Sequence, residues 1–140
     1  MSANPTAPVR QYPTIREYMT PSPHTIARTR SLAAAGQALK DNHIRHLPVL
    51  DGGRIVGMVS ERDLLLVESL PGVTPADVRV EEAMVQDVFT VSPDTPIGEA
   101  IEAMIGRKVG SAIVCEGDRV VGVFTTIDAL TALHRLLERP

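Results

Sequence analysis

The chain has 140 residues, of which 44% are hydrophobic and 22% charged, and this composition is typical of a globular protein rather than a disordered one. A net charge of −3, with two tyrosines, two phenylalanines and no tryptophan, argues against a broad nucleic-acid-binding surface. The single cysteine cannot form an intrachain disulfide, and no apolar run approaches the ~20 residues that span a bilayer, so we expect a cytoplasmic protein without membrane contact.

In chain order, residues 1–13 are expected to form a flexible arm, because three prolines oppose a helix and there is little to bury. They contain no apolar stretch of the kind found in a signal peptide. Residues 15–19 predict a single helical turn, and residues 24–26 an extended piece. Ser31 predicts the N-cap of a helix that runs to about Asn42. Its apolar face has helical spacing and consists of Leu32, Ala35 and Leu39.

The next segment reads as a hairpin followed by a helix. Residues 46–50 and 54–59 predict its two strands, which turn at Asp51-Gly52-Gly53. The second strand is apolar on both faces, which indicates that it is covered on both sides. Ser60 then predicts the start of a helix that ends near Ser69.

A linker over residues 71–78, marked by Pro71-Gly72 and Pro75, ends the first half. After it the same order of elements returns: a turn at 80–84, an extended piece at 89–91, a helix from residue 96, strands at 111–115 and 119–124, and a closing helix at 126–137. Thr95 predicts the N-cap of the first of these helices, with Pro96 at the first helical position.

The second half repeats the first without a gap, at an offset of 122 − 57 = 65 positions. Identical residues recur at this offset for Met19, Thr25, Ala35, Ala38, Val49, Gly52, Arg54, Val56, Gly57, Asp63 and Leu65. Such a register indicates an internal duplication of a β-α-β-β-α unit. We therefore predict an α+β fold of two tandem pseudo-symmetric βαββα repeats, over residues 14–70 and 79–138. The two should pack together, because neither can cover its own sheet.

Each repeat carries the motif Gly-x-x-(Ser/Thr)-x-x-Asp where its last strand becomes its last helix, at Gly57–Asp63 and at Gly122–Asp128. The hydroxyl and the acid three positions later satisfy the capping-box pattern, in which the cap is worth ~1 kcal/mol and needs no ligand. The same atoms can also serve a ligand. The hydroxyl and the first-turn N–H groups can bind a phosphate, and an ionised Asp can accept hydrogen bonds from a ribose diol. The spacing alone leaves both interpretations open.

These features resemble the CBS (cystathionine β-synthase) domain pair, also called a Bateman module. The matching pieces are the turn at 80–84, the strand Arg45-His46-Leu47-Pro48-Val49 and the two Gly-to-Asp motifs, and the resemblance covers Thr14 to Leu137. It implies a regulatory module that binds an adenosine-containing ligand such as AMP, ADP, ATP or S-adenosylmethionine, with no obligatory cofactor. It also implies a homodimer that forms a flat disc of four repeats.

The resemblance further implies roles for particular residues. The hydroxyls are expected to face phosphate and the acids to hold the ribose, which assigns Ser60 and Thr125 to phosphate, and Asp63 and Asp128 to ribose. Arg45 and His46, just before a strand, and Arg62 are further phosphate candidates. In the second repeat, Arg45 and His46 align with Gly110 and Ser111, which have no basic side chains. Because sites in this family lie between the repeats, basic residues of one repeat can serve the motif of the other.

We expect no catalytic activity, because the sequence has no G-x-S-x-G nucleophile motif and no G-x-x-x-x-G-K-(S/T) phosphate loop. No metal site is expected either, since His43 and His46 have no Cys or carboxylate at a zinc-like spacing. The leading hypothesis is a stand-alone regulatory module that holds an adenosine ligand between its repeats and signals to an unknown effector protein. The alternative is a ligand-free scaffold for dimerisation or protein interaction.

Overall fold

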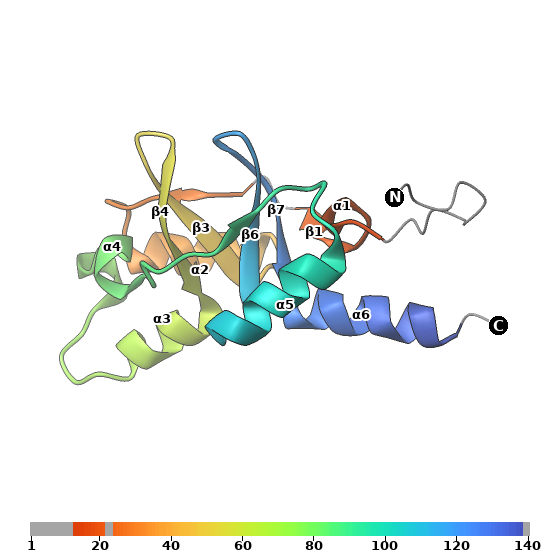
Figure 1. The fold of residues 1–140 in the computed structure, drawn as a ribbon. Helices are drawn as coiled ribbons and strands as arrows, with labels where there is room; N and C mark the ends of the chain where they lie inside the picture. The colour runs from red at the N-terminus through yellow and green to blue at the C-terminus, as the bar shows by residue number, and fades with distance from the viewer. Residues whose placement is uncertain (1–12, 22–23, 139–140) are drawn as a thin grey trace, which may run out of the picture.

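Two β-sheets with flanking helices form the protein (Figure 1). The computed structural model describes residues 13–21 and 24–138, so residues 1–12 of the expected N-terminal arm lie outside the described part. The elements in chain order are α1 (Ile15–Tyr18), β1 (Thr20–Pro21), β2 (Ile26–Ala27), α2 (Leu32–Asp41), β3 (His46–Asp51), β4 (Arg54–Ser60), α3 (Glu61–Glu68), the 3-10 turn η1 (Pro75–Asp77), α4 (Val80–Ala83), β5 (Thr90–Val91), α5 (Ile97–Arg107), β6 (Ser111–Glu116), β7 (Arg119–Thr125) and α6 (Thr126–Leu137). The predicted α+β class and the two repeats are confirmed. Among the described residues, no helix has the length and apolar character needed to cross a membrane.

The two sheets share one topology, as the duplication predicts. In the first sheet β2 runs parallel to β3, and β3 forms an antiparallel hairpin with β4. In the second sheet β5, β6 and β7 pair in the same way. Both predicted hairpins are thus confirmed, and their pairing shifts at the same relative position, Val49/Leu50 in one and Val114/Cys115 in the other. The second sheet also contains β1, an unpredicted edge strand antiparallel to β7.

The start of α5 differs by one residue from the prediction. Pro96 is the N-cap, with φ −59° and ψ 137°, and Ile97 is the first helical residue, so the predicted cap at Thr95 is wrong. Pro96 forms an antiparallel bridge with Thr14, and the carbonyl of Thr95 accepts a hydrogen bond from the N–H of Ile15 at 2.8 Å. This pairing with the chain ahead of α1 accounts for the extended backbone at Pro96 and the later helix start.

The opening segments of the repeats, which are α1 with β1 in one and α4 in the other, each pack into the core of the opposite repeat. Ile15 of α1 is fully buried with Ile97 and Phe124 of the second repeat. Val80 of α4 is fully buried with Leu32 of the first repeat. Figure 1 shows α1 on the side of α6, and α4 on the side of α2, as their contacts require. Neither core is complete without a piece of the other half of the chain.

Backbone hydrogen bonds hold both opening segments at corresponding positions. Two hydrogen bonds hold the segment before and at the start of α4: Leu32 N–H to Val78 C=O at 2.8 Å and Val80 N–H to Arg30 C=O at 2.7 Å. Two hold the segment before and at the start of α1: Ile97 N–H to Pro13 C=O at 3.0 Å and Ile15 N–H to Thr95 C=O at 2.8 Å. Every residue of the second pair is related to one of the first by the 65-residue offset. The exchange is therefore part of the duplicated architecture.

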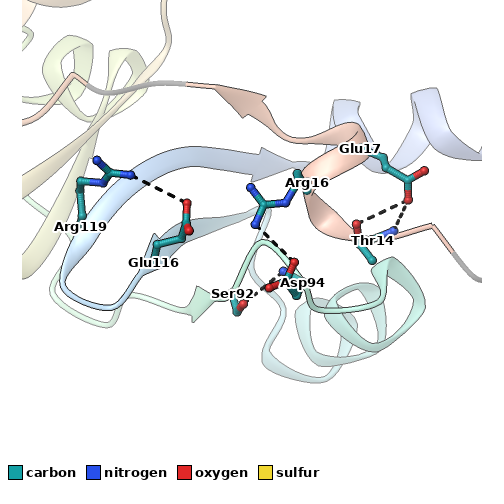
Figure 2. Close-up of polar contacts among 7 residues, drawn as sticks. All are labelled: Thr14, Arg16, Glu17, Ser92, Asp94, Glu116 and Arg119. Carbon is teal, nitrogen blue, oxygen red and sulfur yellow. Dashed lines mark hydrogen bonds and ion pairs between the residues drawn. The ribbon is translucent and has the colours of Figure 1, made fainter.

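Side chains around α1 add contacts at the surface (Figure 2). Arg16 Nη2 lies 3.3 Å from Asp94 Oδ1, and the Thr14 N–H donates to Glu17 Oε2 at 2.6 Å. The Arg16 side chain is 51% exposed and that of Asp94 80%, so this pair contributes at most ~1 kcal/mol. Burial of Ile15 is the stronger cause of the position of α1.

A third apolar cluster joins the two sheets. Met58 of β4 is buried with Ile113 and Val120 of the second hairpin. The sheets therefore meet along the strands that lead into the two Gly-to-Asp motifs, and this contact sets the motifs of the two repeats near each other.

Candidate functional site

Glycine opens both motifs because the opposite opening segment comes close to the strand at these two points. A Cβ at Gly57 would lie 2.8 Å from the carbonyl oxygen of Val85, and one at Gly122 would lie 2.7 Å from that of Thr20. The Met58 N–H donates to the same Val85 carbonyl at 2.9 Å, so the approach is a backbone pairing. Close backbone approach alone accounts for the glycines.

The hydroxyls of both motifs cap the helices that follow, as the capping interpretation predicts. Ser60 Oγ accepts from the Asp63 N–H at 3.1 Å, and Asp63 Oδ2 accepts from the Ser60 N–H at 2.9 Å. For Thr125 and Asp128 the corresponding distances are 3.4 and 2.8 Å. Each hydroxyl also donates to its carboxylate, at 2.9 Å in the first repeat and 3.2 Å in the second. A ligand at these helix starts would have to share atoms with complete capping boxes.

The two carboxylates differ in their second oxygen. Asp128 Oδ1 accepts a hydrogen bond from Thr20 Oγ1 at 3.0 Å. The residue that corresponds to Thr20 at the 65-residue offset is Val85 of the second repeat, which lies beside the motif of the first repeat and has no hydroxyl. Within residues 13–21 and 24–138, the hydrogen bonds to the side chain of Asp63 all end on Oδ2. Asp63 therefore keeps one carboxylate oxygen without a protein donor in the described part of the chain.

Two clefts between the repeats are lined by residues of the Gly-to-Asp motifs, and the larger of these, cleft 1, has a volume of about 550 Å³. Residues 43–46, which lead into β3 and include its first residue, line it from the first repeat, and residues 125–127, at the start of α6, line it from the second. Thr20, Gly110 and Val123 complete its lining. Cleft 1 thus combines a basic segment of one repeat with a helix N-terminus of the other.

Cleft 2, with a volume of about 350 Å³, is the counterpart of cleft 1 at the 65-residue offset. Ser60, Arg62 and Asp63 line it from the first repeat, and residues 109–111 line it from the second. Asp87 also faces this cleft. The duplication therefore produces two related cavities whose linings carry different charges.

The predicted site residues divide between the two clefts. Arg45 and His46 share cleft 1 with Thr125, so the basic residues of the first repeat do meet the motif of the second. Asp128 is held just behind that lining by its bonds to Thr125 and Thr20. The remaining candidates, Ser60, Arg62 and Asp63, line cleft 2. The roles of these residues in ligand binding stay predictions.

His46 lines both clefts and is half-buried. Burial is the main cause that lowers the pKa of its imidazole, Asp63 and Asp128 oppose the shift, and Arg45 adds to it. The ring is therefore neutral at pH 7, with one N–H donor and one acceptor nitrogen. A phosphate beside it would raise the pKa again, because an anion favours the imidazolium.

Sequence reasoning missed several polar residues of the clefts, among them Thr20, Thr126 and Asp87. Thr20 follows Met19, one of the residues repeated at the 65-residue offset, so the register could have identified its position. Asp87 lies on the chain between α4 and β5, where no pattern marks it. In the described part of the chain, no group of three His, Cys, Asp or Glu side chains could hold a metal ion.

Two βαββα repeats with exchanged opening segments and a pair of clefts define a tandem-repeat module. The family model of the CBS domain matches residues 15–69 and again residues 80–135. The chain belongs to the CBS domain family and contains a CBS domain pair.

Relatives by sequence include proteins of different sizes. The chain is 33% identical over 129 residues to the A-adding tRNA nucleotidyltransferase of Aquifex aeolicus, a match that covers 89% of the chain but 15% of that enzyme. It is 29% identical to a CBS domain-containing protein of Dictyostelium discoideum, with 89% of the chain and 93% of that protein covered. The chain thus spans about one seventh of the two nucleotidyltransferases it matches, at 15% and 14% of their lengths.

Solved structures share the same fold. A Vibrio cholerae protein described as an acetoin utilization protein, AcuB, superposes with a TM-score of 0.73 at 32% identity, over 91% of this chain and 95% of that one. The CBS domain pair of protein MJ0100, crystallised in complex with 5′-methylthioadenosine and S-adenosyl-L-methionine, gives a TM-score of 0.74 at 23% identity, over 89% and 98%. At that identity the second comparison establishes the fold alone.

Proposed function

We propose that the protein is a regulatory module that binds an adenosine-containing ligand between its repeats and transmits the bound state to an effector protein. The observation that carries the proposal is the meeting of Arg45 and His46 with Thr125 in cleft 1. A cation, a hydroxyl and the N-terminus of a 12-residue helix then face one cavity, which suits a phosphate group. The proposal places the module in the cytoplasm and gives it no catalytic activity of its own.

The clefts have the size and lining that such a ligand needs. Volumes of about 550 and 350 Å³ fall within the ~300–1,000 Å³ typical of small-molecule sites. Ile44, Val123 and Ile127 give cleft 1 an apolar wall against which an adenine can pack. The CBS pair of MJ0100, whose two bound compounds both contain adenosine, supports adenosine as the part that is recognised.

Phosphate binding at Thr125 would change the hydrogen bonding of the cap. The hydroxyl has a single proton, which it donates to Asp128 in the free protein. On binding, the hydroxyl would turn toward the phosphate, while the Thr125 N–H keeps its bond to Asp128 Oδ2. The start of α6 would therefore respond to the ligand, and α6 would carry the change to whatever packs on it.

The helices expose a large apolar surface that supports a homodimer. Exposed side chains on α3, α5 and α6 include Leu65, Leu66, Ile105, Ile127, Leu130, Leu133 and Leu137. Ile127, Leu130, Leu133 and Leu137 recur at helical spacing along α6, and an exposed apolar helix face of this kind marks an interaction site more often than free surface. Ile127 is 65% exposed and also lines cleft 1, so ligand and dimer partner would share a residue. Sedimentation velocity should show a dimer, and Leu130→Glu should weaken it.

A panel of AMP, ADP, ATP, S-adenosylmethionine and 5′-methylthioadenosine tests the proposal by thermal shift and calorimetric titration. A ligand at 100 times its dissociation constant should stabilise the fold by ~2.7 kcal/mol. Asp128→Asn retains an acceptor oxygen for the cap. It should therefore weaken ligand binding while the melting temperature of the ligand-free protein changes little. Absence of heat and of any melting shift at millimolar concentration of every compound would refute the proposal.

A ligand-free interaction scaffold is the second candidate. It is favoured by the complete capping boxes, which need no ligand, and by the exposed apolar helix faces. This candidate predicts a stable complex with a protein partner that is unaffected by any adenosine compound. The panel above therefore separates the two.

A further inference from the structure

The two clefts differ in charge although one duplication produced both. Basic and hydroxyl side chains line cleft 1, namely His43, Arg45, His46, Thr20, Thr125 and Thr126, and its described lining contains no carboxylate. Two carboxylates, Asp63 and Asp87, line cleft 2 together with Arg62 and with His46, which the two clefts share. We infer that cleft 1 takes a phosphorylated adenosine ligand, and that cleft 2 takes an adenosine derivative that is uncharged or positively charged at its 5′ end. The inference rests on the proposed function and assigns a ligand class to each cleft.

Substitutions at aligned positions account for the difference. Arg45 of cleft 1 corresponds to Gly110, and His46 to Ser111, so cleft 2 lacks the basic segment before the strand. The first residue of the helix behind cleft 1 is Thr126, whereas the corresponding residue of α3 is Glu61. A carboxylate in the first turn of a helix stabilises the helix but competes with a phosphate for the same N–H groups.

Arg45 is the decisive charge of cleft 1. It is exposed, and among the described residues it forms no ion pair within 4.0 Å. Its guanidinium therefore needs no release from a carboxylate before it meets a phosphate, which it can bind through two parallel hydrogen bonds. The half-buried imidazole of His46 adds a donor from the same segment.

Asp63 is the decisive charge of cleft 2. It is half-buried, and its Oδ1 has no protein donor in the described part of the chain. An ionised carboxylate accepts hydrogen bonds and repels phosphate, so it favours ribose hydroxyls, amines and a sulfonium. Arg62 directly precedes Asp63 in the first turn of α3 and offsets the negative charge of Asp63. The second carboxylate of cleft 2, Asp87, forms an ion pair with Arg107 at 3.2 Å. Cleft 2 as a whole thus lacks the net positive charge of cleft 1.

Calorimetric competition between two probes tests the inference on the whole chain. ATP is titrated into the protein alone and into the protein saturated with 5′-methylthioadenosine, and the order is then reversed. Separate clefts predict that each probe binds once per chain with an affinity that changes less than threefold in the presence of the other. ATP affinity should also fall with added salt, while that of the uncharged probe should not. Displacement of one probe by the other would overturn the inference.

Three variants locate the two ligand classes. Arg45→Gln should weaken ATP about 10–100-fold and leave 5′-methylthioadenosine within threefold, because hydrogen bonds to charged groups are the stronger ones. Asp63→Asn should weaken 5′-methylthioadenosine and spare ATP. Arg119→Gln, at a hairpin tip outside both clefts, makes the same change in net charge as Arg45→Gln and should alter neither affinity.

The outcomes separate the two hypotheses. If no adenosine compound binds, the proposed function fails and the inference falls with it. If the compounds bind but Arg45→Gln weakens both probes equally, or Asp63→Asn weakens both equally, the proposed function stands and the assignment of ligand classes is wrong.

Discussion

Replacing the motif glycines by alanine tests the exchanged architecture most sharply. In Gly57→Ala the new methyl group would lie 2.8 Å from the Val85 carbonyl oxygen, and in Gly122→Ala it would lie 2.7 Å from that of Thr20. Both oxygens belong to backbone, so a change of rotamer cannot relieve the contact. The opening segment would have to move away from the strand, with strain on backbone pairs such as Met58 N–H to Val85 C=O at 2.9 Å.

The expected loss follows from known magnitudes. Overpacking in a well-packed region costs ~1–3 kcal/mol, and each weakened hydrogen bond adds up to ~1 kcal/mol. The reduced entropy of the unfolded chain offsets ~0.4–1 kcal/mol of this. The net result is a destabilisation of about 1–3 kcal/mol for each substitution. At about 3 °C per kcal/mol for 140 residues, the melting temperature should fall by roughly 3–9 °C.

Urea denaturation and differential scanning calorimetry measure the effect, and Gly36→Ala is the matched control. Gly36 lies inside α2, where a Cβ would meet only the Leu64 Cδ1 atom, at an ordinary 3.8 Å. The control should stabilise by up to ~1 kcal/mol, since alanine is the better helix former. If Gly57→Ala and Gly122→Ala prove as harmless as Gly36→Ala, the opening segments do not pack as described.

Three further predictions concern the motif and its surroundings. Ser60→Ala and Thr125→Ala should each destabilise the fold by ~1 kcal/mol in urea denaturation, because each removes a helix cap. The control Thr131→Ala removes only a hydroxyl bond to the preceding turn of α6 and should be neutral within ~0.5 kcal/mol. Equal effects of the three substitutions would contradict the capping geometry. Burial lowers the pKa of His46 in the folded protein, so the unfolded chain binds more protons than the folded one at acidic pH. The free energy of unfolding should therefore decrease as the pH falls from about 6.5 through the folded-state pKa, by at most ~1.4 kcal/mol per pH unit. His46→Gln should flatten that part of the stability profile between pH 7 and pH 5, and an unchanged slope would show that the imidazole is not buried as described. Thr20→Val, which gives the first repeat the residue type that Val85 supplies at the same position of the second, should cost ~0.5–1.5 kcal/mol in the same denaturation assay. No loss would show that the hydroxyl bond from Thr20 to the α6 carboxylate is not formed.

Local patterns in the sequence were sufficient to predict most of the regular elements, although not the edge strand β1. Apolar runs and the Gly-containing turns define both hairpins. Side-chain caps define helix starts, as at Ser31, whose Oγ accepts from the Ala34 N–H at 3.0 Å. The cap of α5 was missed by one residue, because Pro96 is held extended by its bridge to Thr14, more than eighty positions away in the chain. The preferences of hydroxyl residues and proline at helix starts are local, so they do not take account of a distant segment, such as the one at Thr14, that pairs with the helix start.

The exchange of opening segments could not be predicted from the sequence. A four-residue helix such as α1 or α4 has one buried residue, Ile15 or Val80, and an isoleucine fits the core of either repeat about equally well. The 65-residue register makes the two cores chemically alike, so periodicity does not distinguish a segment that packs on its own repeat from one that crosses over. Gly57 and Gly122 are present in the sequence because the crossing segments come close to the strands at these positions. This reason becomes clear only when the positions of the neighbouring carbonyl oxygens are known.

The candidate site was predicted in its parts more than in its arrangement. The duplicated motif and the family resemblance led to Asp63, Asp128 and the basic residues, and the suggestion that a site draws on both repeats agrees with the lining of cleft 1. The bond from Thr20 to the second oxygen of Asp128 was not foreseen, because it joins residues 108 positions apart. The unequal charge of the clefts depends on the same kind of long-range placement.

Amide chemical shifts during an ATP titration would test the central claim most directly. The account predicts saturable shifts that cluster in residues 43–46 and residues 125–128 together, with Thr20 and Gly110 included, since these segments of both repeats face cleft 1. Shifts confined to one repeat, shifts centred on the exposed faces of α3 and α6, or no saturable shifts at millimolar ATP would contradict a phosphate-binding site shared between the repeats.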